Sequence, residues 1–265
     1  MVLLEHVIDL LGKSILLFIQ LFGLSIVFAY ILTWISRSLK GVVNSFFGHK
    51  GQLFFGWIGI IIHELGHLIF AILFRHRIDK VNLLNLSSDD GSLGSVSHSY
   101  KKYSLFNNIG HYFIGIAPIF TCAFSIIGLY LILFRDSIPL FVENIQGLIE
   151  HQDMMLFFHS VLDTLMVVDY SFLKSALFIL VVLNIVTGGF DLSDSDYKSI
   201  YGGIIPIFFV SVLVTFIIQV FFKDIVLTNW ILGLNVALGI TLGTSLLIGL
   251  VTLLMVRGII LILFR

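Results

Sequence analysis

Long apolar segments separated by short polar ones dominate the chain of 265 residues. A helix that crosses a bilayer needs about 20 consecutive apolar residues. Six segments meet or approach this length, and they span residues 14–35, 53–74, 109–134, 172–189, 204–222 and 230–264. The pattern therefore predicts an all-α, polytopic membrane protein with about six transmembrane helices.

The polar segments between these helices are short, and the most polar of them spans residues 75–104. Within it, Asp90-Gly91 lies between two short alternating runs, a pattern typical of a hairpin turn. We therefore expect a small hairpin-like loop after the second apolar helix. The chain is predicted to form one integral membrane domain over residues 1–265, with its core at 53–200 and C-terminal helices at 201–265.

Composition supports lipid as the solvent of much of the chain. Hydrophobic residues make up 58% of the sequence, charged residues only 12%, and the mean hydropathy is +1.07. A soluble domain has about twice that charged fraction. The net charge of -1 gives no signal for nucleic-acid binding, so the lipid bilayer is the expected partner, and the oligomeric state stays open.

Basic residues predict the orientation of the helices, because loops rich in lysine and arginine stay on the cytoplasmic side. The loop after the third apolar segment contains mainly Arg135, whereas the loop at 75–104 contains five cations: Arg75, Arg77, Lys80, Lys101 and Lys102. We therefore expect the loop at 75–104 and both chain termini to be cytoplasmic, at the cell membrane if the protein is bacterial.

The second apolar segment contains the sequence His63-Glu64-Leu65-Gly66-His67. Residues four apart lie on the same face of a helix, so His63 and His67 can bind one metal ion together. Glu64 would then lie beside the metal, where it can act as the general base of a hydrolytic reaction. Two histidines and a carboxylate are costly in hydrocarbon, which favours a functional site over a polar packing cluster.

A catalytic zinc site needs a third protein ligand. Asn184 lies in an apolar segment that is followed by two glycines and Asp191, and this combination favours irregular backbone lining a cavity. Asp191 is the first choice for the ligand, and Asp194, Asp196 and His98 are the alternatives. Asp196 also stands three residues after Ser193, as in a helix capping box, which favours a structural role for it.

These features resemble the site-2 proteases, the intramembrane zinc metalloproteases. The resemblance rests on the motif at His63–His67 within an apolar helix, on the polar hairpin that follows, and on Asn184 ahead of Asp191. It implies Zn²⁺ as the cofactor, Asp191 as the third ligand, and Asn184 as a residue that holds the substrate backbone. The chain departs from the family where Thr187 replaces a proline and Leu192 replaces the glycine after the aspartate.

The sequence thus predicts an intramembrane zinc endopeptidase that cleaves in or near a transmembrane segment of a membrane protein or peptide substrate. His63, His67 and Asp191 are expected to hold zinc, Glu64 to activate water, and Asn184 to bind substrate. Two rivals use the same residues: a metal-binding transporter, and a catalytically inactive membrane scaffold. The intact Glu64 favours the enzyme, because metal binding alone does not require a glutamate at that position.

Overall fold

A computed structural model describes residues 2–85, 93–101, 103–151, 155–156, 159–160, 163, 171–221 and 226–263. In this part of the chain, five helices are long and apolar enough to cross a membrane. The prediction of an all-α, polytopic membrane protein is therefore confirmed. The chain divides into two compact units, one made of Met1–Ala123 and Leu183–Arg265, the other of Phe124–Val182.

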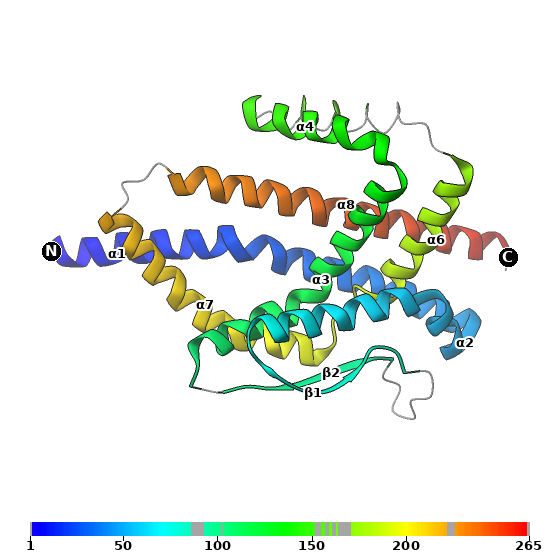
Figure 1. Ribbon diagram of the computed structural model, residues 1–265, viewed down its shortest axis with the longest axis horizontal. Coiled ribbons are helices and arrows are strands. Elements are labelled where there is room, and N and C mark those ends of the chain that lie inside the picture. Colours follow the sequence, from blue (N-terminus) through cyan, green and yellow to red (C-terminus); the bar gives the residue numbers. More distant parts are fainter. Residues whose placement is uncertain are drawn as a thin grey trace. The chain divides into compact units, whose positions relative to one another are not determined.

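The N-terminal half of the larger unit is nearly continuous helix: α1 (Val2–Phe18), a π-helical turn η1 (Ile19–Gly23) and α2 (Leu24–Leu73). Gly48 interrupts α2 with φ 63°, a conformation that glycine adopts readily because it lacks a Cβ. The chain reverses there, and the two arms of α2 run in opposite directions (Figure 1). They belong to separate candidate spans, Glu5–Gly48 and Lys50–Leu73.

The hairpin expected after the second apolar segment is present as strands β1 (Arg77–Asn82) and β2 (Ser95–Ser99). The strands are antiparallel and pair Val81 with Val96, with a register shift between Ile78 and Lys80. Both strands pack against α2, and they lie side by side along its second arm (Figure 1). The predicted turn at residues 90–91 lies outside the described residues.

Three later helices complete the candidate spans: α3 (Leu105–Leu133), α7 (Asp194–Phe221) and α8 (Val226–Leu263). The fourth predicted segment forms α6 (Phe172–Gly188), a shorter apolar helix whose 17 residues stand at the lower end of the range of about 17–25 for a crossing. The smaller unit contains the end of α3, the 3₁₀ turn η2 (Arg135–Ser137), α4 (Ile138–His151) and the start of α6. In the larger unit, α1 packs against α7 and α2 against α8.

Glycines allow close backbone approach where the elements around the motif meet. A Cβ on Gly59 of α2 would lie 2.6 Å from the backbone nitrogen of Gly189, just after α6. A Cβ on Gly115 of α3 would lie 2.5 Å from the carbonyl oxygen of Asp196 in α7. Small residues drive helix association in membranes because they permit such contacts. These contacts bring the end of α6 and the start of α7 next to α2 and α3.

Candidate metal centre

The two histidines of the motif lie on the second arm of α2 and face each other. Both side chains are buried, and their Nε2 atoms are 3.1 Å apart. The Nδ1 of His63 is 2.8 Å from the carbonyl oxygen of Gly189, and that of His67 is 2.8 Å from the carbonyl oxygen of Ile114. A carbonyl oxygen only accepts hydrogen bonds, so both Nδ1 atoms donate and both Nε2 atoms present lone pairs in the neutral rings.

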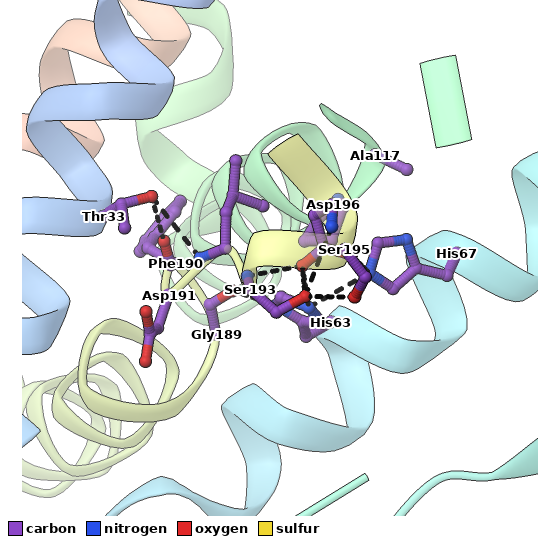
Figure 2. Close-up of polar contacts among 12 residues, drawn as sticks. Thr33, His63, His67, Ala117, Gly189, Phe190, Asp191, Ser193, Ser195 and Asp196 are labelled. Atoms are coloured by element: carbon purple, nitrogen blue, oxygen red, sulfur yellow. Dashed lines mark hydrogen bonds and ion pairs between the residues drawn. The ribbon is translucent and has the colours of Figure 1, made fainter. Parts of the chain in front are cut away.

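Asp196, in the first turn of α7, completes the cluster. One carboxylate oxygen is 3.1 Å from Nε2 of His67, and the other is 3.7 Å from Nε2 of His63. Figure 2 shows the three side chains turned toward one another, with Asp191 directed away from them. Among the described residues, these three form the single group of His, Cys, Asp or Glu side chains arranged to hold a metal ion.

The sequence predicted a capping interaction for Asp196, and in the structure this interaction holds the Asp196 carboxylate in place. The backbone N–H and the hydroxyl of Ser193 donate to Asp196 Oδ2 at 2.6 and 2.7 Å, and the Asp196 N–H lies 3.3 Å from the Ser193 hydroxyl. This reciprocal pairing is that of a capping box. The structural and the ligand roles of Asp196 are therefore compatible: the cap holds the carboxylate in place while its oxygens face the histidines.

The cluster is compact enough to hold one metal ion. The Nε2 atoms of the two histidines are 3.1 Å apart, and with one carboxylate oxygen of Asp196 the ligand atoms all lie within 4.8 Å of one another. The Nδ1 bonds to backbone carbonyls are the outer-shell contacts that metal-binding histidines usually make, and they orient each Nε2 toward the centre. Two imidazole nitrogens and a carboxylate that converge in this way form a ligand set that could hold a metal ion.

Glu64 lies at the same site and is 8% exposed. A cavity of about 820 Å³ is lined by Glu64, by the three-residue cluster, and by residues 93–98 at the start of the hairpin's second strand. Gly94 approaches the glutamate so closely that a Cβ there would lie 2.7 Å from Glu64 Cγ and 3.0 Å from Oε1. The hairpin thus forms one wall of the cavity directly over the carboxylate.

The structure does not bring Asp191, the first choice for the third ligand, into the cluster. Its carboxylate pairs with Arg37 at 2.8 Å and with Lys40 at 2.9 Å, both from the first arm of α2. Burial alone would raise the pKa of Asp191, but the two cations outweigh burial and hold that pKa below its ordinary value. Asp191 is therefore an ion-paired carboxylate at the wall of the cavity, and Asp196 takes its place beside the histidines.

Asn184 uses its amide to join two helices. Its Oδ1 accepts from the N–H of Ile58 at 2.7 Å, and its Nδ2 donates to the carbonyl of Phe54 at 3.2 Å. These two backbone groups are i and i+4 partners in a regular helix, so the asparagine satisfies both ends of one helical turn. The cavity at Glu64 is lined by other residues. The arrangement explains a buried asparagine by packing, while its predicted role in substrate binding stays a prediction.

The remaining alternatives for the third ligand also lie apart from the histidine pair. Asp194 is exposed in the first turn of α7. His98 lines the cavity, but its Nδ1 lies 2.9 Å from Nδ1 of His76. Burial and the nearby rings of His76 and His111 lower the pKa of His98 to about 4.

Several residues and backbone groups that shape the site were not among the site residues predicted from the sequence. Gly94, Arg37 and Lys40 belong to this set, as do the carbonyl groups of Gly189 and Ile114. The basic residues carry a usable signal, because cations near an apolar span need a carboxylate partner. Backbone carbonyls carry none, since every residue has one.

No family model, no curated protein and no solved structure matches the chain. The functional interpretation therefore rests on the residues of the site and on their geometry.

Proposed function

We propose that the protein is an intramembrane zinc endopeptidase that hydrolyses a peptide bond in or near a transmembrane segment of another membrane protein. One observation carries this proposal: ligand atoms of His63, His67 and Asp196 converge within 4.8 Å of one another beside Glu64. The His-Glu-x-x-His pattern supports it, because this pattern pairs two metal ligands with a general base. Five helices are long and apolar enough to cross a membrane, and the motif lies in one of them, Lys50–Leu73.

Bound zinc would supply a Lewis acid that lowers the pKa of a coordinated water to about 7. Glu64 follows His63 directly and lines the cavity, so its carboxylate is positioned to accept a proton from the attacking water and deliver it to the leaving amine. His63 and His67 keep their Nδ1 hydrogens on backbone carbonyls, which fixes the ring orientation throughout.

The hairpin offers a way to present a peptide. Strand β2 pairs with β1 in a two-stranded sheet, and no third strand extends that sheet in the described part of the chain. An extended peptide can add to such an edge through backbone hydrogen bonds. Because residues 93–98 line the cavity, a peptide added there would lie beside Glu64. We further propose that this hairpin and both chain termini face the cytoplasm, as the basic residues predict. Two termini on one side of the membrane need an even number of crossings, so this orientation counts α6 as a sixth crossing beside the five longer helices.

Zinc content of the protein purified in detergent tests the metal site. We expect about one zinc ion per chain, lost in Asp196→Asn and in His67→Ala and retained in Asp191→Asn. The Asp191 variant is the matched control, since it makes the same chemical change five residues away. A folded wild-type protein without zinc, even after zinc is supplied, would contradict the proposal.

Hydrolysis is tested by comparing membrane-protein termini in cells that express the wild type or Glu64→Gln. The enzyme predicts new termini within or beside apolar segments in the wild type alone, while the purified Glu64 variant keeps its zinc. A transporter or an inactive scaffold predicts identical sets of termini. Matching sets from cells with equal amounts of both proteins would therefore refute the peptidase and leave a metal-binding membrane protein.

A further inference from the structure

A second cavity of about 650 Å³ lies at the junction of α2, β2 and α3, and it is rich in cations. Arg75, Arg77 and Lys101 line it together with the hydroxyl residues Ser99 and Ser104. Arg77 pairs with Asp79 at 3.7 Å. Within the described residues, neither Arg75 nor Lys101 forms an ion pair, so two of the three cations at this cavity have no carboxylate partner in that part of the chain.

Arg75 occupies a position that normally belongs to glycine. Its N–H bonds to the carbonyl of Ile72 at 3.0 Å, and the His76 N–H bonds to that of Ala71 at 2.8 Å. This is the Schellman pattern that ends a helix, and its left-handed residue is usually glycine. Arg75 adopts φ 57°, which is unfavourable for a residue with a Cβ. A strained residue held by its surroundings is a feature of functional sites.

The surroundings also orient the Arg75 side chain. Its guanidinium carbon lies 6.0 Å from the centre of the Phe106 ring, within the range of a cation–π contact. The Asn107 side chain donates to the carbonyls of Phe74 and Arg75 at 3.2 and 3.1 Å, which anchors the turn. These contacts direct the Arg75 guanidinium toward the cavity.

The cavity lies between the ends of two candidate membrane spans. One candidate span ends at Leu73, two residues before Arg75, and another begins at Leu105, directly after Ser104. Tyr103, Leu105 and Phe106 are all exposed there, as aromatic and apolar residues commonly are at a membrane interface. Cations and hydroxyls thus stand next to apolar surface at the depth of lipid headgroups.

We infer that this cavity binds the phosphate of an anionic phospholipid, with Arg75 and Lys101 as its principal cationic contacts. Basic pockets between transmembrane helices bind anionic headgroups through such charge-assisted contacts. The exposed side chains at the start of α3 would contact the acyl chains. This site is separate from the metal centre and does not depend on the proposed peptidase activity.

Binding is measured by native mass spectrometry of the full-length protein in a nonionic detergent. Phosphatidylglycerol, phosphatidylcholine and inorganic phosphate are titrated separately. Arg75→Gly is the informative variant, because glycine suits the left-handed backbone and preserves the turn. Lys80→Gln is the matched control: it removes one charge from the same hairpin, at an exposed residue outside the cavity.

We expect saturable binding of phosphatidylglycerol that is about fivefold weaker in Arg75→Gly and unchanged in Lys80→Gln, since one interfacial cation contributes about that factor. Phosphatidylcholine and inorganic phosphate should bind more weakly. Equal binding by Arg75→Gly and the wild type would overturn the inference, as would an equal loss in Lys80→Gln. Inorganic phosphate bound as tightly as the lipid would indicate a soluble-anion site instead.

Discussion

Replacing Asp196 by asparagine separates the two roles of this residue. Asparagine has nearly the same size and can still accept from the N–H and hydroxyl of Ser193, which donate at 2.6 and 2.7 Å in the wild type. The helix cap should therefore survive. The charged oxygens that lie 3.1 and 3.7 Å from the two histidine Nε2 atoms are lost. The variant thus tests the metal site with little disturbance of α7.

The expected loss of zinc affinity is large. Removing an outer-shell partner of a metal ligand costs about 10–100-fold in affinity, so removing a direct ligand should cost at least about 100-fold, or about 2.7 kcal/mol. Asp191→Asn leaves the three acceptors in place and should change zinc affinity by less than about threefold. Its own cost falls on the pairs with Arg37 and Lys40, worth about 1 kcal/mol or less each because their partners are partly exposed.

Competition with a chromophoric chelator gives the zinc affinity of wild-type, Asp196→Asn and Asp191→Asn proteins at one pH and salt concentration. Thermal unfolding in the presence of chelator checks that the apo forms are equally folded. Zinc bound as tightly by Asp196→Asn as by the wild type would refute Asp196 as a ligand. An equal loss in the Asp191 variant would refute the division of roles between the two aspartates.

Gly59→Ala should lower the melting temperature, because its Cβ would come within 2.6–2.8 Å of backbone atoms at the end of α6 and overpacking costs about 1–3 kcal/mol; Gly41→Ala, with open space around it, is the control and should be neutral or stabilising. Because the pKa of His98 falls from 6.5 to about 4 on folding, the unfolded chain binds the extra proton in that window. Stability should therefore decrease as pH falls from 6.5 to 4, and thermal scans should show a shallower decrease in His98→Gln. Gly94→Val should retain zinc yet impair hydrolysis, because its side chain would displace the Glu64 carboxyl group; loss of zinc in this variant would show that the hairpin supports the ligands instead.

The 3.6-residue period of the α-helix explains why two residues of the metal centre, His63 and His67, could be predicted from the sequence. His63 and His67 stand four residues apart, so any helix places them on one face, and the structure has them 3.1 Å apart at Nε2. The apolar segments likewise predicted the membrane-spanning helices, and the polar segment at residues 75–104 predicted the hairpin. α6 differs because its described helix has only 17 residues, and a hydropathy pattern does not report where a helix begins.

The third ligand could not be predicted because its position depends on packing between elements far apart in sequence. Asp191 and Asp196 both follow α6 closely, and the local sequence favoured Asp191 because the capping box assigned Asp196 a structural role. The cations that pair with Asp191 come from the first arm of α2, whereas Asp196 is brought to the histidines by the close contact of α7 with Gly115 of α3. The capping box correctly predicts Asp196 in a first helical turn, and in the structure the cap supports the carboxylate that faces the histidines.

The residues of the metal cluster are synthesised at different times, because they lie far apart in the sequence. His63 and His67 belong to the second arm of α2, whereas Asp196 opens α7, after α3, α4 and α6 have been made. A growing chain that has only reached α6 therefore holds two imidazoles without their carboxylate and without the carbonyl of Gly189 that orients His63. The three candidate metal ligands are therefore complete only once α7 has been synthesised, so a chain truncated after α6 should bind a metal ion more weakly than the full chain.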